Sequence, residues 1–312
     1  MSSPIRIMTY NVRYFGHALR GLASTRTSLD GIAARIASLK PRPDVICLQE
    51  IETISMRSRL AFRRSDAAHT QLDSFMELLH AACDALGEPC RYEAFYFRAH
   101  TYGPTSAPIY TTGLAILVDI HRLDVAGHNA DSPHHITHHH VVRWKDAKQS
   151  RICAHMRLAD DHGRPLHIFN THLSLPTPFA REFWSERDKL GYGVNQVREA
   201  ETLSSFVARH AGDDPFVLCG DFNSPPFSAV YRRLSESGLK CAQAVLNQLH
   251  PQDPRHFPTA GFMRLRMHLD HLFSGGPLSW VDLDDTRRFG DRQNPFHGLS
   301  DHVPLIARFE LG

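Results

Sequence analysis

The chain has 312 residues, of which 42% are hydrophobic and 22% are charged, and its formal net charge is only +2. This composition is typical of a soluble globular protein, and the small charge argues against a strongly basic, duplex-binding surface. No apolar run approaches the ~20 residues of a membrane helix, and the N-terminus lacks the apolar core of a secretory signal. None of the six cysteines forms a CxxC pair, so we expect reduced thiols and a cytoplasmic protein.

In chain order, a predicted strand over residues 6–12 is followed by residues 29–40, whose apolar side chains recur three and four positions apart. That spacing is typical of an amphipathic helix. The next apolar run, residues 44–50, is a predicted buried strand. Residues 72–86 form a second predicted helix, which ends before Gly87.

The remainder of the chain continues this alternation of strands and helices. Further helices are predicted over residues 197–211 and within 225–239. The further expected strands are 91–97, 111–119, 141–145, 151–158, 167–173, 216–223, 269–273 and 303–311. The pattern predicts an α/β protein.

Three segments interrupt this pattern. Residues 52–70 contain four closely spaced arginines and are expected to form a surface insertion. Residues 175–197 combine aromatic and basic side chains and are expected to form a loop. Residues 134–140, HHITHHH, could bind a transition metal, but adjacent side chains of a strand point to opposite faces. A surface hairpin is therefore the expected structure there.

Polar side chains capable of binding metal or moving protons follow several predicted strands. They form six clusters: Asn11 in TYNV, Glu50 in CLQE, His172 in NTHL, Asp221 and Asn223 in GDFNS, Asp270 in HLDH, and Asp301 with His302 in GLSDH. Such groups are costly to bury unless they are paired or bound to a metal, so one shared site is expected. Because the clusters extend over most of the sequence, we predict a single catalytic domain over residues 1–312.

These residue types suit metal-assisted hydrolysis of a phosphoester. Glu50 with oxygen-rich neighbours suits a hard cation, Mg²⁺, with Mn²⁺ as the alternative. Asp221 can act as a general base towards water. His172 and His302 can stabilise the negative charge of an in-line transition state, and Asp270 is a candidate for orienting a histidine.

The ordered set TYNV, LQE, NTHL, GDFNS, LDH and SDHVPL resembles the endonuclease/exonuclease/phosphatase superfamily. Its members include deoxyribonuclease I, abasic endonucleases of the exonuclease III type, inositol polyphosphate 5-phosphatases and neutral sphingomyelinases. The resemblance covers nearly the whole chain. It implies a four-layer α/β sandwich of two packed, mostly antiparallel or mixed β-sheets flanked by helices. It also implies Mg²⁺-dependent hydrolysis of a phosphoester at one end of the sheets.

The resemblance further implies a role for each matched residue. By motif match, Asn11 and Glu50 would lie at the metal, Asp301 would support the metal or the water network, Asp221 would orient or deprotonate the water, Asn223 would contact the phosphate, His172 and His302 would contact phosphoryl oxygens, and Asp270 would orient His302.

Two positions depart from the pattern of the abasic endonucleases. Arg13 stands where those enzymes usually have aspartate, and His172 stands where they usually have tyrosine. The histidine is similar to that of deoxyribonuclease I and of the sphingomyelinase and phosphatase branches. Repair of abasic sites is therefore disfavoured.

Loops set the substrate of such a fold, and several classes remain open. Phe183 and Trp184 could stack bases, or residues 175–197 could make a peripheral contact with a membrane; Arg13 and Arg264 are further candidates for substrate binding. We predict a phosphodiesterase that acts on DNA or RNA. The alternatives are a phospholipase C- or sphingomyelinase-like hydrolase of phospholipid head groups and an inositol-phosphate-type phosphatase. An inactive binding scaffold is a remote alternative, and no obligate protein partner is predicted.

Overall fold

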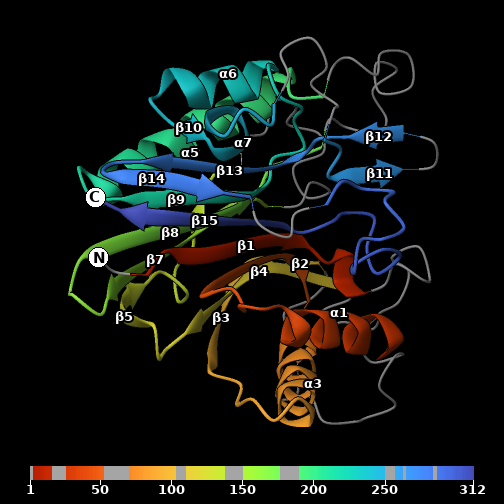
Figure 1. Cartoon of the computed structure of the whole chain (residues 1–312). Helices are drawn as coiled ribbons and strands as arrows, with labels where there is room; N and C mark the ends of the chain where they lie inside the picture. The colour runs from red at the N-terminus through yellow and green to blue at the C-terminus, as the bar shows by residue number, and fades with distance from the viewer. Residues whose placement is uncertain are drawn as a thin grey trace.

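The computed structural model describes residues 3–15, 26–52, 70–102, 110–137, 150–175, 190–249, 257–262, 265–283 and 287–312. Two large β-sheets pack face to face, and helices cover their outer faces (Figure 1). This is the four-layer α/β sandwich that the sequence predicted.

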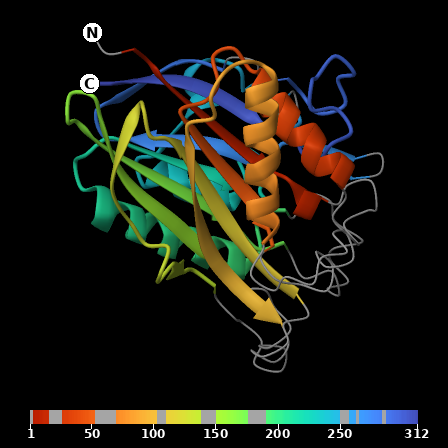
Figure 2. The same ribbon diagram turned by 90° about the horizontal axis from the view of Figure 1, so that it is seen from below.

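The first sheet has the strand order β14-β15-β1-β2-β4-β3. Its strands are β1 (Ile5–Asn11), β2 (Val45–Ile51), β3 (Tyr92–Tyr102), β4 (Tyr110–Asp119), β14 (Leu278–Asp282) and β15 (Leu305–Leu311). Only the β1–β2 pair is parallel within this sheet. Helices α1 (Arg26–Ser38) and α3 (Gln71–Ala85) lie across its outer face, as Figure 2 shows from below. The predicted apolar stripe of α1, including Leu29, Ile32 and Ile36, is fully buried there.

The second sheet has the order β10-β13-β9-β8-β7-β5, with β6 paired to β7. Its strands are β5 (Leu123–His128), β6 (His134–His135), β7 (Ile152–Asp160), β8 (Pro165–His172), β9 (Phe216–Asp221), β10 (Lys240–Cys241) and β13 (Asp270–Gly275). The β8–β9 pair is parallel. Helices α5 (Val194–Ala211) and α6 (Ala229–Glu236) cover its outer face, and the short helix α7 (Ala242–Val245) follows β10. A small hairpin pairs β11 (Ala260–Phe262) with β12 (Leu265–Met267).

The main core lies between the two sheets. Alternate side chains of β1 and β2, such as Ile7 and Cys47, pack into one cluster with Ile168 of β8 and with Val217 and Cys219 of β9. This alternation is expected, because successive side chains of a strand point to opposite faces. All six cysteines are free thiols, as predicted.

Several elements differ from the expectations. Helix α5 begins at Val194, three residues before the predicted start, so the segment expected as a loop over 175–197 ends earlier. Strands β5, β11, β12 and β14 escaped prediction because they are short, and in β5, β12 and β14 exposed polar residues also weaken the apolar signal. His134 and His135 form the short strand β6, which pairs antiparallel with β7. Residues 53–69, 138–149 and 176–189 lie outside the described residues. In the part of the chain that is described, none of the helices combines the length and apolar composition needed to cross a membrane.

A buried histidine pair in the second sheet makes the fold sensitive to acid. His155 Nε2 lies 2.8 Å from His167 Nδ1, and the His155 ring stacks on Phe169 with centroids 4.4 Å apart. Burial, together with the nearby charges of His167, His210 and Arg157, lowers the pKa of His155 to about 3. In the unfolded chain His155 therefore takes up a proton near pH 6.5, whereas in the folded chain it stays neutral until the pH is far lower.

We expect this pair to cost stability as the pH falls from about 6.5 towards 3. Above pH 6.5 the histidine is neutral in both states and the contribution is constant; below it, His155 costs about 1 kcal/mol per pH unit. Urea unfolding at pH 7.5, 6 and 5 checks this against the His155→Phe variant, which keeps a ring on Phe169. The variant should lose less free energy of unfolding than the wild type over this range. Equal losses would contradict the assignment.

Candidate active site

Strand topology brings the predicted polar residues to one end of the sandwich. The parallel strands β1, β2, β8 and β9 all end there, and the antiparallel strands β13 and β15 begin there (Figure 1). In the second sheet, Asp221 at the end of β9 is in register with His172 of β8 on one side and with Asp270 of β13 on the other. These three residues, which span 98 positions of the sequence, are thus adjacent because of strand pairing alone.

Asn11 joins the two sheets at this end. Its Nδ2 donates to Glu50 Oε1 at 3.1 Å and to Asp221 Oδ2 at 3.0 Å. The backbone N–H of Arg13 donates to Asn11 Oδ1 at 3.0 Å, which leaves the amide nitrogen facing the carboxylates. One amide therefore draws a carboxylate from each sheet into the same small volume.

Two histidines flank Asp221 and differ in their surroundings. His172 Nε2 lies 3.5 Å from Asp221 Oδ2, and His302 Nε2 lies 3.7 Å from the same oxygen. The other ring nitrogen of His302, Nδ1, lies 2.8 Å from Asp270 Oδ2. Asp270 thus fixes the ring of His302 so that Nε2 points to Asp221.

Electrostatics separate the charge states of the two histidines. Burial lowers the pKa of His172 well below its ordinary value, and the charges of Arg151 and His302 lower it further. Burial also opposes a charge on His302, but the carboxylates Asp270 and Asp221 outweigh it and raise the pKa of His302 well above its ordinary value. The site therefore holds one neutral imidazole and one imidazolium.

The environment of Asp221 and Glu50 disfavours the ionised form of both carboxyl groups. Burial raises the pKa of Asp221 to about 7, with the charge of His302 opposing and that of Asp270 adding to the shift. Burial, followed by the charge of Asp301, raises the pKa of Glu50. Two carboxylates that resist ionisation side by side are typical of sites that receive a cation.

Strained backbone conformations concentrate at the same place. Arg13, Glu50 and Asn223 have φ values of 46°, 58° and 48°, which lie in the left-handed region. Such conformations cost roughly 1–3 kcal/mol each in non-glycine residues and cluster at functional sites. The end of β9 also depends on Gly220, whose φ is 141° and whose added Cβ would lie 2.0 Å from the Thr171 carbonyl oxygen.

We expect Gly220→Ala to reduce the free energy of unfolding by about 3 kcal/mol or more, because backbone cannot yield to the new methyl group as a side chain can. Gly163→Ala is the matched control, since Gly163 also has a positive φ, 73°, but nothing lies within 4 Å of its added Cβ. The control should lose only about 1 kcal/mol. Chemical denaturation of both variants measures the difference. A Gly220→Ala variant as stable as the control would contradict the expected clash.

The sequence matches the endonuclease/exonuclease/phosphatase family over residues 8–302. The chain belongs to this family. Family membership identifies the protein as an enzyme of the phosphoester-hydrolase type, and the family is generally metal-dependent. The superfamily resemblance of the motifs is thereby confirmed.

Two curated relatives are distantly similar to this chain. Nocturnin of Drosophila melanogaster is 23% identical over 304 residues, which cover 88% of this chain and 40% of that protein. Nocturnin of Rattus norvegicus is 26% identical over 162 residues, which cover 48% of this chain and 35% of that protein. The chain therefore spans well under half the length of these curated relatives.

Solved structures of the family share the fold. The human Nocturnin catalytic domain with a bound sulfate anion superposes with a TM-score of 0.61 at 20% identity, covering 99% of this chain and 95% of that one. ANGEL2, described as a 2′,3′-cyclic phosphatase, superposes with a TM-score of 0.64 at 16% identity, covering 98% of this chain and 95% of that one. At these identities the likeness establishes the architecture alone.

The donor atoms at the family site fit a divalent cation. Among the described residues, Asp221, Asp270 and His302 form one cluster whose ligand-type atoms lie within 4.8 Å of one another; its two carboxylates can receive a cation, whereas the protonated His302 cannot. Asp270 Oδ1 is buried and has no hydrogen-bond partner among these residues, and a buried carboxylate oxygen in that state favours a nearby cation. With the Glu50 carboxylate, the set is rich in oxygen, as Mg²⁺ and Mn²⁺ prefer.

Asp301 lies in an ion pair at the edge of the site. Arg13 Nη1 lies 2.6 Å from Asp301 Oδ2, with side chains that are 22% and 20% exposed. The backbone carbonyl of Asp301 accepts a hydrogen bond from the Gly261 N–H of β11 at 2.8 Å. The metal-supporting role of Asp301 and the substrate contact of Arg13 both stay predictions. Because the two side chains form an ion pair, a change in one would affect the other.

Asn223 is fixed by its neighbours. Its backbone N–H donates to Asp221 Oδ1 at 2.9 Å, and its Nδ2 donates to the Leu173 carbonyl at 2.9 Å. The first bond positions the Asp221 carboxylate, and the second closes the loop after β8. The predicted phosphate contact of Asn223 stays a prediction. Phe183, Trp184 and Arg264 lie outside the described residues.

Two polar residues behind the site were missed by sequence reasoning. Gln49 Nε2 donates to Asn170 Oδ1 at 2.8 Å, across the interface between the sheets. Asn170 Nδ2 in turn donates to the carbonyls of Leu48 and Ala115 at 3.1 and 3.2 Å. This buried network sets the position of β2 relative to β8, directly behind Glu50 and His172. The polar residues that interrupt the LQE and NTH runs were the available signal.

Arg151, just before β7, was also missed. Its positive charge lowers the pKa of His172 and counteracts the raised pKa of Glu50, so its guanidinium lies near both. Its Nε is buried without a hydrogen-bond partner among the described residues. An isolated arginine before a strand carries little signal in one sequence, because most such residues are solvated.

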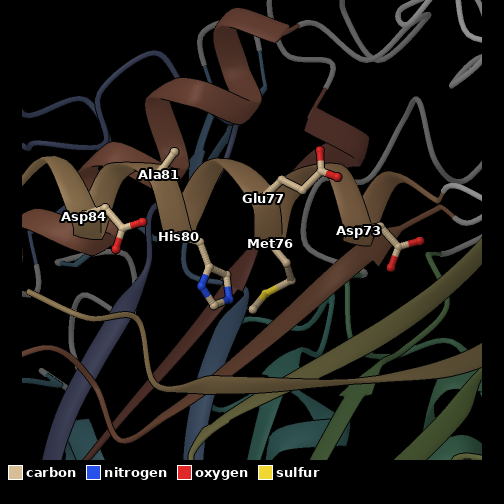
Figure 3. Close-up of a pocket in the computed structure, with 6 residues that line it drawn as sticks. All are labelled: Asp73, Met76, Glu77, His80, Ala81 and Asp84. Carbon is tan, nitrogen blue, oxygen red and sulfur yellow. The ribbon is translucent and has the colours of Figure 1, made fainter.

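An open hollow along α3 is unrelated to this cluster. It is lined by Asp73, Met76, Glu77, His80, Ala81 and Asp84, all on one helix (Figure 3). Its three carboxylates would repel an anionic phosphoester. The hollow therefore does not compete with the end of the sheets as a candidate active site.

Proposed function

We propose that the protein is a Mg²⁺-dependent phosphodiesterase that hydrolyses DNA or RNA by in-line attack of water. The observation that carries this proposal is the bridge made by Asn11, which holds Glu50 and Asp221 together between two histidines of opposite charge state. Such a site can hold a cation, activate water and stabilise an anionic transition state.

Glu50 would hold the cation, with Asn11 beside it and with Asp301 supporting the metal or the water network. When bound, the cation supplies positive charge that neutralises the phosphoryl group. Mn²⁺ has similar ligand preferences and could replace Mg²⁺.

Asp221 is the proposed general base, and its carboxylate is oriented by the Asn223 N–H at 2.9 Å. His302 carries a positive charge and directs Nε2 to the same place, so it would donate to a phosphoryl oxygen. Neutral His172 would donate to a second phosphoryl oxygen from the other side. Arg151 adds a permanent charge beside Glu50. Together these groups oppose the negative charge that builds up in the transition state.

Nucleic acid is favoured over the other substrate classes by the relatives. ANGEL2 is described as a 2′,3′-cyclic phosphatase, and one of its structures is a complex with adenosine-2′,3′-vanadate, a ligand built on a nucleoside. The phospholipid alternative depends on residues 175–197, of which 176–189 lie outside the described residues. The cytoplasmic location stays a prediction.

A substrate panel with Mg²⁺ or with a chelator tests the proposal. Single-stranded DNA, duplex DNA, RNA, sphingomyelin vesicles, phosphatidylcholine vesicles and inositol phosphates would be incubated with the purified protein, and products separated. Mg²⁺-dependent cleavage of nucleic acid is expected. Release of head groups or of free phosphate alone would replace the nuclease with the phospholipase or phosphatase alternative. No hydrolysis and no metal binding would favour the inactive scaffold.

A further inference from the structure

A basic cavity adjoins the candidate active site beside Ser300. Its volume is about 400 Å³, and its lining is Arg266, Phe289, Gly290, Arg292, Phe296, His297, Gly298, Ser300 and Val303. This lining includes two arginines and one histidine and, among the described residues, no carboxylate. It differs from the hollow on α3, whose lining is acidic.

Hydrogen bonds connect this cavity to the catalytic cluster. Ser300 Oγ donates to the Asn11 carbonyl at 2.7 Å and accepts from the His302 N–H at 3.2 Å. On the other wall, Arg266 of β12 is in register with Gly261 of β11, whose N–H donates to the Asp301 carbonyl. Two residues of the cavity lining, Ser300 and Val303, thus flank Asp301 and His302 in the sequence.

The surrounding residues hold the Arg266 guanidinium in place. Its Cζ lies 5.0 Å from the centre of the Phe289 ring, and Nη1 donates to the Leu265 carbonyl at 2.8 Å. The Phe289 ring needs the space that Gly261 provides, since a Cβ there would lie 2.1 Å from it. A guanidinium stacked on a ring loses little further freedom when it binds a phosphate, for which its planar fork is suited.

Two described carboxylates near the cavity pair with arginines outside its lining. Asp291 lies 3.7 Å from Arg287, and Asp301 lies 2.6 Å from Arg13. Among the described residues, the lining holds the two arginines Arg266 and Arg292 and no carboxylate, so an anion is the ligand that it suits.

We propose that this cavity is a second phosphate subsite, which binds a non-reacting phosphate of the substrate while the reacting phosphate lies beside Asp221 and His302. The inference rests on the proposed function and narrows its substrate class. Favoured substrates are nucleotides or oligonucleotides that carry at least one phosphate beyond the bond that is cleaved.

A pair of dinucleotides that differ only in a terminal phosphate tests the subsite. Hydrolysis of thymidylyl-thymidine is compared with that of its 5′- and 3′-phosphorylated forms. The wild type should prefer one phosphorylated form by about tenfold in kcat/KM. Arg266→Gln and Arg292→Gln should reduce this preference towards one. Arg288→Gln, an exposed arginine of the same segment outside the lining, should retain it. An unchanged preference in the two lining variants would overturn the subsite.

A binding measurement without catalysis separates this inference from the proposed function. Calorimetry with adenosine 3′,5′-bisphosphate, in the presence of chelator, should show binding about tenfold weaker in Arg266→Gln and Arg292→Gln than in the wild type and in Arg288→Gln. If this pattern holds but no dinucleotide is cleaved, only the proposed function fails. If dinucleotides are cleaved but binding ignores the two arginines, only the subsite fails.

Inorganic phosphate distinguishes a substrate subsite from a site for a free anion. Phosphate should inhibit cleavage of the phosphorylated dinucleotide competitively, with weaker inhibition in Arg292→Gln. Activation by phosphate that disappears in Arg292→Gln would overturn the inference, since the cavity would then bind a separate effector.

Discussion

Replacing Asp221 by asparagine is expected to lower kcat for phosphodiester hydrolysis by about a thousandfold or more, equivalent to about 4 kcal/mol of transition-state stabilisation. Asp221 lies at the centre of the cluster, within 3.0 Å of Asn11 Nδ2 and within 3.7 Å of both histidine Nε2 atoms. The amide keeps the shape of the carboxylate but can neither accept a proton nor offset a cation's charge. Steady-state kinetics and a Mg²⁺ titration by calorimetry measure both losses.

Asp160→Asn is the control for loss of a buried carboxylate. Asp160 is 5% exposed and pairs with Arg164 at 2.8 Å, in β7 and away from the catalytic cluster. This variant should lose stability but keep its kcat below its own unfolding temperature. If Asp221→Asn retained wild-type kcat, or if the two variants lost activity equally, Asp221 would not be the base.

Replacing Asp270 by asparagine is expected to lower kcat by roughly a hundredfold to ten-thousandfold, as when a histidine loses its orienting carboxylate elsewhere. Asp270 Oδ2 lies 2.8 Å from His302 Nδ1, and both side chains are buried. Removing one partner of a buried ion pair also costs about 3–5 kcal/mol of folding free energy, so kinetics should be measured at low temperature with unfolding curves alongside.

The double variant Asp270→Asn/His302→Ala distinguishes a positioning role from an independent one. If Asp270 acts through His302, the double variant should lose little more kcat than His302→Ala alone, because residues that work as a unit are strongly non-additive. Multiplicative losses would mean that Asp270 contributes to catalysis on its own.

Much of the fold and of the catalytic cluster could be predicted because each apolar run indicates a strand and the polar residue at its end indicates a site. The apolar runs that predicted β2, β8 and β9 end in Glu50, His172 and Asp221. Parallel pairing then carries these residues to the same end of the sandwich. The ordered motifs identified the superfamily, which the family match over residues 8–302 confirms. Short strands such as β5 and β14 gave no such signal, because exposed polar residues interrupt their apolar pattern.

Interactions between distant residues were beyond prediction from one sequence. The contact of Gln49 with Asn170 crosses 121 positions, and the Arg13–Asp301 pair joins the two ends of the chain. In neither pair does the sequence around one residue show a pattern that would identify the other. Arg151 is similar, since only the packing of β7 beside β8 places its charge near His172.

The most direct test of the account is the rate at which the purified chain hydrolyses bis(p-nitrophenyl) phosphate with Mg²⁺, with excess chelator, and with Mg²⁺ in the Asp221→Asn variant. This small diester needs no loop-determined specificity, so it reports on the cluster formed by Glu50, Asp221 and His302. The account predicts hydrolysis that requires Mg²⁺ and falls to the background rate in the variant. Hydrolysis that persists in chelator, or that survives the Asp221→Asn change, would contradict it.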